Sequence, residues 1–154
     1  MIRRMKPYPT AIANIKGSND YPSLHGIVTF KQMPKGVLVT AETHGLPYGN
    51  ECNSGIFAFH IHNRTGCTGN ATDPFADADG HYNPNGCPHP YHAGDLPPLF
   101  GNHGYAYMSV FTDRFTVKEI IGKVIIIHGQ PDDFKTQPAG NAGVKIACGK
   151  ILAR

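Results

Sequence analysis

In the segment GIFAFHIH, residues Gly55–His62, large apolar side chains alternate strictly with smaller or polar ones from Phe57 onward. In a β-strand the large apolar side chains share one face, and His60 and His62 share the other, because successive side chains point to opposite faces. The two imidazoles then start about 7 Å apart at the backbone. That separation suits two nitrogen ligands of one metal ion, and it equally suits two polar residues on the solvent face of an edge strand.

Short stretches rich in β-branched residues occur along the rest of the chain, separated by turn residues. The other strand candidates are Ala11–Ile15, Gly26–Met33, Gly36–His44, Tyr105–Thr112, Lys123–His128 and Val144–Ile151. Pro34 and Lys35 separate two of them, which predicts a β-hairpin. Phe115–Ile120 fits either a strand or a helical turn. Seven or eight short strands with turn signals predict an all-β sandwich or barrel.

The length and composition are typical of one small domain covering residues 1–154. A chain of 154 residues is long enough for one full hydrophobic core and too short for two comfortable ones. Charged residues make up 16% of the chain and the net charge is +3, so charge predicts neither nucleic-acid binding nor a polybasic membrane segment. No apolar run reaches about 18 residues, and we expect no membrane span.

A long stretch without periodicity, residues 63–95, carries a concentration of potential metal ligands. His81, His89, His92 and Asp95 lie within it. Imidazole nitrogens with one carboxylate suit a tetrahedral zinc ion, and a bound ion would tie down a loop that has little core of its own. The alternative is a polar surface loop whose histidines are incidental.

His128 ends the apolar run KVIIIH, which places it at the mouth of a predicted strand. Alone, such a histidine is more often a structural residue at a strand end. Asp132 and Asp133 follow shortly after, and a carboxylate there can hydrogen-bond the free ring nitrogen of a metal-bound histidine. The same residues also fit an ordinary turn, since Pro131 precedes them.

In their common order, these segments resemble the copper–zinc superoxide dismutase family over about Gly26–Ile151. The matching segments are FHIH (Phe59–His62), GC (Gly66–Cys67), GHYNP (Gly80–Pro84), His89, HAGDL (His92–Leu96), IGKVIIIH (Ile121–His128), PDD (Pro131–Asp133) and GNAGVKIACGKI (Gly140–Ile151). Each segment alone is weakly specific. Their shared order, with all seven metal positions filled, is strongly specific.

The resemblance implies two metal sites that share one histidine. The implied copper ligands are His60, His62, His81 and His128. The implied zinc ligands are His81, His89, His92 and Asp95, so that His81 bridges the two metals through both ring nitrogens. Asp132 matches the carboxylate that links a copper-bound histidine to a zinc-bound one, here His60 and His89.

The resemblance also implies a fold and a covalent link. The fold is an eight-stranded Greek-key β-barrel or sandwich, immunoglobulin-like in class, with a long metal-binding loop. Cys67 and Cys148 match the family's internal disulfide. Cys52 and Cys87 have no counterpart there, and by subtraction they are candidates for a second disulfide, the alternatives being two free thiols or a Cys87 that competes for zinc.

The implied activity is the conversion of superoxide to dioxygen and hydrogen peroxide at copper, supported by zinc. His81 has an implied catalytic role as proton carrier, and Lys145 occupies the position that guides the anion to copper. That position is usually arginine; lysine keeps the charge but lacks the planar fork, so we expect turnover below the diffusion limit. The alternative function is a copper- and zinc-binding domain of this fold with little turnover.

Assembly and location are less constrained by the sequence. The short segment between His62 and Cys67, and Lys150 where an apolar interface residue is expected, predict a monomer or a homodimer unlike the eukaryotic type. Met1–Thr10 is basic without a following hydrophobic region, so it does not fit a signal peptide. We expect a cytoplasmic protein, or an extracytoplasmic one whose export segment is absent from this sequence.

Overall fold

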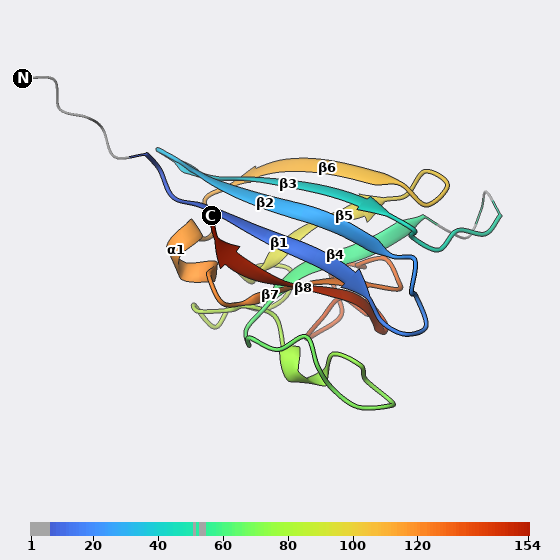
Figure 1. Cartoon of the computed structure of the whole chain (residues 1–154). Helices are drawn as coiled ribbons and strands as arrows, with labels where there is room; N and C mark the ends of the chain where they lie inside the picture. The colour runs from blue at the N-terminus through green and yellow to red at the C-terminus, as the bar shows by residue number, and fades with distance from the viewer. Residues whose placement is uncertain (1–6, 51, 53–54) are drawn as a thin grey trace, which may run out of the picture.

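Eight antiparallel strands form one curved sheet in the computed structural model, which describes residues 7–50, 52 and 55–154 (Figure 1). The strands are β1 (Thr10–Gly17), β2 (His25–Met33), β3 (Gly36–His44), β4 (Ile56–His62), β5 (Asp95–Phe100), β6 (Ala106–Thr112), β7 (Val124–His128) and β8 (Lys145–Ala153). A short 3-10 helix, η1 (Ala76–Ala78), and one helical turn, α1 (Val117–Ile120), complete the elements. The expected all-β class is confirmed.

The sheet curls into a nearly closed barrel. Its strand order is β5-β4-β7-β8-β1-β2-β3-β6, so that β5 and β6 are the two edges, and the curvature brings them toward each other (Figure 1). The β2–β3 pair is the predicted hairpin, in which Met33 faces Gly36 across the turn. The connections from β3 to β4 and from β6 to β7 cross between non-neighbouring strands, whereas a simple meander would join neighbours only.

The barrel interior holds the main hydrophobic core. Phe57, Phe59 and Ile61 of β4 point into it, as their alternation predicted, and all three are buried. Burying a side chain of this size contributes about 1.5–3 kcal/mol. His60 and His62, on the other face of β4, are also buried, because loops cover that face of the strand. The solvent-face alternative for this histidine pair is therefore wrong.

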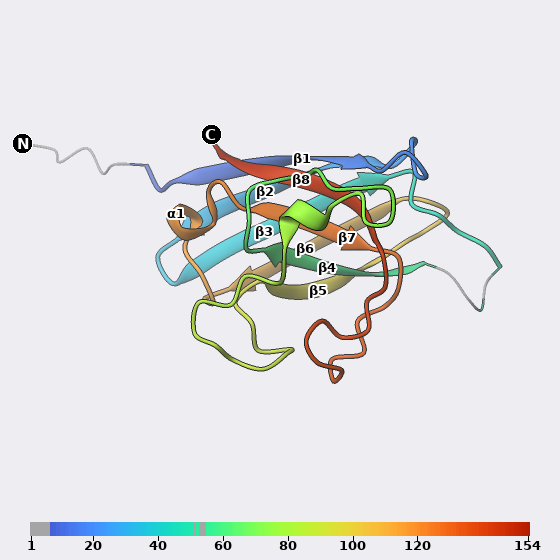
Figure 2. The ribbon, with the colours of Figure 1, turned by 90° about the horizontal axis from the view of Figure 1, so that it is seen from below.

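The segment between β4 and β5 is irregular but anchored. Phe75 and Ala78 in it pack against Val124 and Ile126 on the outer face of β7, which forms a second, smaller apolar cluster (Figure 2, green segment crossing the barrel). Cys67 and Cys148 form a disulfide that joins the same segment to β8. The disulfide expected from the family resemblance is confirmed.

Two local expectations needed the structure to settle them. Phe115–Ile120 contains a helical turn rather than a strand, and the Thr116 N–H donates to the Glu119 carboxylate at 2.6 Å to begin it. β5 begins where the predicted irregular stretch, residues 63–95, ends, and its residues Pro97 and Pro98 explain why no strand was predicted there. Proline cannot donate to a β-ladder, and it is tolerated in β5 because β5 is an edge strand.

The second disulfide suggested for Cys52 and Cys87 is wrong, since both cysteines are free. The segment before β4 that carries Cys52 and the loop that carries Cys87 lie at opposite ends of the barrel in both views (Figures 1 and 2). The Asn83 side chain holds Cys87 in its own turn, accepting from its N–H at 2.9 Å and donating to its carbonyl at 2.8 Å.

Among the described residues no helix combines the length and apolar character needed to cross a membrane. The expectation about an export signal in Met1–Thr10 falls mostly on residues 1–6, which lie outside the described part of the chain.

We expect the Cys67–Cys148 disulfide to stabilise the protein by about 2–5 kcal/mol, because it closes a long loop in the unfolded chain. Urea unfolding of Cys67→Ser should show this loss in the free energy of unfolding. Cys87→Ser is the matched control and should leave the midpoint nearly unchanged. Equal midpoints for Cys67→Ser and the parent would contradict the prediction.

Candidate metal centre

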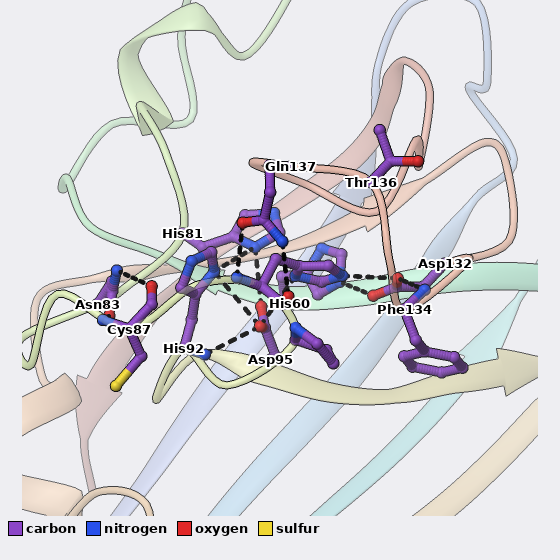
Figure 3. A network of polar contacts seen from close by, with 12 residues as sticks. His60, His81, Asn83, Cys87, His92, Asp95, Asp132, Phe134, Thr136 and Gln137 are labelled. Atoms are coloured by element: carbon purple, nitrogen blue, oxygen red, sulfur yellow. Dashed lines mark hydrogen bonds and ion pairs between the residues drawn. The ribbon is translucent and has the colours of Figure 1, made fainter.

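Seven side chains from four parts of the fold converge on the outer face of β4. They form two groups, and within each group one potential ligand atom per residue lies within 4.8 Å of every other. The first histidine group is His60, His62, His81 and His128. The second group is His81, His89, His92 and Asp95, and several of these residues are shown in Figure 3. His81 is the one member of both.

The ring orientation of His62 and His128 leaves two nitrogen lone pairs facing each other. His62 Nδ1 donates to the Asp79 carbonyl at 2.6 Å, and His128 Nδ1 contacts the Gly143 carbonyl at 3.3 Å. With both Nδ1 atoms protonated, neither Nε2 carries a proton, yet the two Nε2 atoms are 3.2 Å apart. Two lone pairs at this distance repel unless a cation lies between them, which is what two ligands of one metal require.

His60 and His81 complete the first histidine group with nitrogens that have no partner. His60 Nε2 donates to Asp132 Oδ2 at 2.8 Å, which leaves His60 Nδ1 as an unprotonated atom. His60 Nδ1 and His81 Nε2 are both buried without a hydrogen-bond partner. A buried polar atom left unpaired costs about 1–3 kcal/mol, so these nitrogens fit a bound ion better than an apolar void.

The second group gathers three Nδ1 atoms around one carboxylate. Asp95 Oδ1 lies 2.8 Å from His81 Nδ1, while its Oδ2 lies 3.0 Å from His89 Nδ1 and 3.3 Å from His92 Nδ1. The His89 contact is short but not oriented as a hydrogen bond, and that nitrogen is otherwise without a partner. Three imidazole nitrogens and one carboxylate are a typical tetrahedral zinc set.

Asp132 connects the two groups by binding the ring nitrogens of His60 and His89 that face away from the proposed metal positions. Its two carboxylate oxygens accept from His60 Nε2 and His89 Nε2, each at 2.8 Å (Figure 3). Burial by itself would raise the pKa of Asp132, but these hydrogen bonds and one from the Phe134 N–H hold the pKa well below its usual range. The carboxylate therefore stays ionised, fixes both rings, and leaves both Nδ1 atoms free to bind a metal.

Burial keeps His60, His62 and His128 of the first histidine group neutral. Desolvation lowers the pKa of His60 to about 4 and that of His128 to about 3, and it lowers the pKa of His62 well below its ordinary value. Neighbouring positive charge, including the Lys145 ammonium, contributes to the lowered pKa of His128. Neutral imidazoles are the form that binds metal ions.

The structure thus brings together all seven ligand residues and places Asp132 behind two of them. Asp133 does not take part: its carboxylate instead accepts from the Lys135 and Thr136 backbone N–H groups at the surface. Lys145 begins β8 opposite His128, and its ammonium lies 2.6 Å from Asp73 Oδ2, an ion pair that sequence reasoning did not anticipate.

Two polar side chains that support the second group were also not predicted from the sequence. The Gln137 side chain accepts from the His89 N–H at 2.8 Å and donates to the His89 carbonyl at 2.7 Å (Figure 3). Arg114 Nη1 donates to the carbonyls of Pro90, His92 and Asp95 at 3.0, 3.3 and 3.4 Å. Both bind backbone groups, and a contact of that kind leaves no spacing pattern in a sequence.

The donor sets suit two different ions. Four imidazole nitrogens can supply the tetragonal nitrogen coordination that copper(II) favours. The second group offers three nitrogens and a carboxylate, with no thiolate, and fits zinc. His81 would be shared by the two ions, since its Nδ1 faces the second group and its Nε2 is the atom left for the first.

Comparison with known proteins supports the same interpretation. The profile of the copper/zinc superoxide dismutase (SODC) family matches residues 24–151. "Superoxide dismutase [Cu-Zn] 2" of Aquifex aeolicus is 37% identical over 131 residues, which cover 75% of this chain and 72% of that protein. "Superoxide dismutase [Cu-Zn]" of Deinococcus radiodurans is 32% identical over 146 residues, covering 83% and 77%.

A solved structure agrees in fold. A crystal structure of a double mutant of a SOD-like protein from Bacillus subtilis superposes with a TM-score of 0.74 at 27% sequence identity. The alignment covers 92% of this chain and 96% of that one. The barrel fold is therefore found in an experimentally determined structure as well.

Gly140→Ala should weaken metal binding about 10- to 100-fold, the effect typical of disturbing a group that orients the ligands. A Cβ at Gly140 would lie 2.0 Å from Asp132 Oδ1 and 2.6 Å from His89 Nε2, so the carboxylate must move. Gly122→Ala is the matched control, because Gly122 also has a positive φ but open space around it. Competition with a metal chelator measures both affinities, and equal losses would contradict the prediction.

The metal-free protein should lose stability as the pH falls below 6.5. The unfolded chain takes up protons on these histidines near their ordinary pKa of 6.5, whereas folded His60 does so only near 4 and His128 near 3. Protonation therefore favours unfolding, by on the order of 2 kcal/mol per such histidine at pH 5. Urea midpoints at pH 8, 6.5 and 5 measure this, and a flat series would be inconsistent with buried neutral imidazoles.

Proposed function

The chain belongs to the copper/zinc superoxide dismutase family, and we propose that it converts two superoxide anions and two protons to dioxygen and hydrogen peroxide. The first histidine group would hold copper and the second group would hold zinc. The observation that carries this assignment is His81: its Nδ1 faces the second group, while its buried Nε2 is left without a partner on the side of the first.

The two metals would divide the chemistry. Bound copper supplies one-electron redox chemistry, and zinc supplies a fixed positive charge that does not change oxidation state. The protein's part is to hold the ligand rings where the metals need them. His60 is fixed by Asp132, His62 by the Asp79 carbonyl and His128 by the Gly143 carbonyl, all through the ring nitrogen that faces away from the first group.

His81 is the residue that can carry a proton at this site. Its Nδ1 is occupied by the second group, so Nε2 is the one ring atom at which a proton could be gained or lost, whenever that atom is not itself a copper ligand. A proton held there faces the same space as the nitrogens of His60 and His62. It is therefore placed to pass to a reduced oxygen species bound beside the first histidine group, as general acid catalysis requires.

The second group is held rigidly, which fixes the position of His81. Arg114 binds three carbonyls of the loop that carries His92 and Asp95, and Gln137 binds the backbone of His89 on both sides. Zinc at this group would bind three residues of the same loop and Asp95 at the start of β5. His81, the proton donor, thus keeps its position relative to His60, His62 and His128 between turnovers.

Lys145 supplies positive charge next to the first histidine group. Its backbone pairs with that of His128, and directly opposed residues of an antiparallel pair project to the same face of the sheet. A cation at this place attracts a monovalent anion. Lysine lacks the fork with which arginine holds an anion by two bonds, so we propose attraction without firm orientation.

The assembly we propose is a monomer or a homodimer unlike the eukaryotic type. Lys150 is exposed on β8, which supports this view, because a charged side chain in the middle of an apolar interface is costly. Superoxide is the only partner that the proposed reaction requires.

Reconstitution with copper and zinc followed by a superoxide assay tests the function. We expect two metals per chain and dismutase activity, and His81→Ala should lower that activity by about 100-fold or more, since it removes the proton carrier. His44→Ala, an exposed histidine on β3, is the matched control and should keep full activity.

Two results would overturn the proposal. A chain that binds both metals but turns over no faster than its His81→Ala variant would instead be a metal-binding domain of this fold with little turnover. A chain that takes up neither metal after reconstitution would exclude both functions.

A further inference from the structure

The Lys145 ammonium has a counter-charge of its own. Its Nζ lies 2.6 Å from Asp73 Oδ2, and the side chains of Lys145 and Asp73 are only 17% and 37% exposed. Among the described residues this is the one hydrogen bond or ion pair that the ammonium forms. A largely buried ammonium next to a carboxylate is shielded less by solvent than a surface pair, so the contact carries more energy than most surface ion pairs.

The Asp73 carboxylate is held in place by its own loop. Its Oδ1 accepts from the Phe75 N–H at 3.0 Å, which leaves Oδ2 for Lys145. The Asn70 side chain accepts from the Asp73 N–H at 2.9 Å, and the Asn70 N–H donates to the Asp73 carbonyl at 2.9 Å. Phe75 is buried in the second apolar cluster, so the turn is fixed to β7. Asp73 therefore meets Lys145 without much further loss of conformational freedom.

We propose that Asp73 is a positioning residue that holds the Lys145 ammonium and weakens its attraction for anions at the first histidine group. This inference rests on the proposed function. The carboxylate offsets the positive charge on the same face of the sheet where an anion must approach. It also occupies one of the three N–H donors of the ammonium, leaving two for an incoming anion. Asp73 thus sets how strongly the site draws in superoxide.

Removing the Asp73 carboxylate should strengthen anion binding, and this gain should depend entirely on the presence of Lys145. In the copper- and zinc-loaded protein, Asp73→Asn should bind azide about three- to tenfold more tightly at low salt, an effect that high salt reduces. Lys145→Met should bind azide more weakly, and adding Asp73→Asn to Lys145→Met should change nothing further. The copper absorption band titrated with azide measures these affinities without any turnover.

Asp77→Asn is the matched control for the change of charge. Asp77 lies in the same loop, is exposed, and accepts from the Thr68 hydroxyl rather than from a cation. Its substitution should alter azide affinity less than about twofold, because the charge it removes is screened by solvent. A gain for Asp77→Asn as large as that for Asp73→Asn would overturn the proposal, since the effect would then be general.

A measurement without metal separates this inference from the proposed function. Urea midpoints of the metal-free parent, Asp73→Asn, Lys145→Met and the double variant form a double-mutant cycle. We expect Asp73→Asn to lower the midpoint in the parent and to have no further effect in the Lys145→Met background. Additive midpoints, or azide affinity that is unchanged or weakened by Asp73→Asn, would overturn the proposal. Failure of copper uptake or of dismutase activity instead counts against the proposed function.

Discussion

The structure depends on the convergence of unprotonated imidazole nitrogens beside a barrel strand. In the first histidine group, hydrogen bonds occupy the outward nitrogens of His60, His62 and His128, so the inward ones carry lone pairs. Lone pairs placed this close repel one another, and buried atoms without partners cost free energy. The fold accepts both costs because bound cations turn them into stabilising contacts, and binding free energy then becomes folding free energy.

That convergence needs a loop that is long and yet rigid. The chain between β4 and β5 supplies three of the seven ligand residues, and four separate restraints hold it. Phe75 anchors it to the outer face of β7, the Cys67–Cys148 disulfide joins it to β8, and Arg114 and Gln137 bind its backbone. Each restraint lies outside the metal sites. The metals therefore meet ligands that are already ordered, and little conformational entropy is lost on binding.

Two carboxylates control the charge around the site. Asp132 stays ionised between His60 and His89, and Asp73 accompanies the cation beside the first histidine group. One carboxylate orients ligand rings, whereas the other acts on a charge that an approaching anion would meet. The two acidic residues come from different loops, and each accepts a backbone N–H at Oδ1. In Asp73 this leaves Oδ2 for Lys145, whereas Asp132 also accepts from His89 at Oδ1 and from His60 at Oδ2.

The sequence by itself predicted the all-β class and the β2–β3 hairpin, because alternation and turn residues are local features that a chain displays directly. The full ligand set and the Cys67–Cys148 pair followed from the resemblance of ordered segments to a known family. The sequence missed β5, whose prolines mask an edge strand, and it left Cys52 and Cys87 open until the barrel separated them. Only the tertiary structure decided which ring nitrogens face inward and that Asp73 meets Lys145. These pairings join residues far apart in the chain, and no spacing rule relates them until the strands close the barrel.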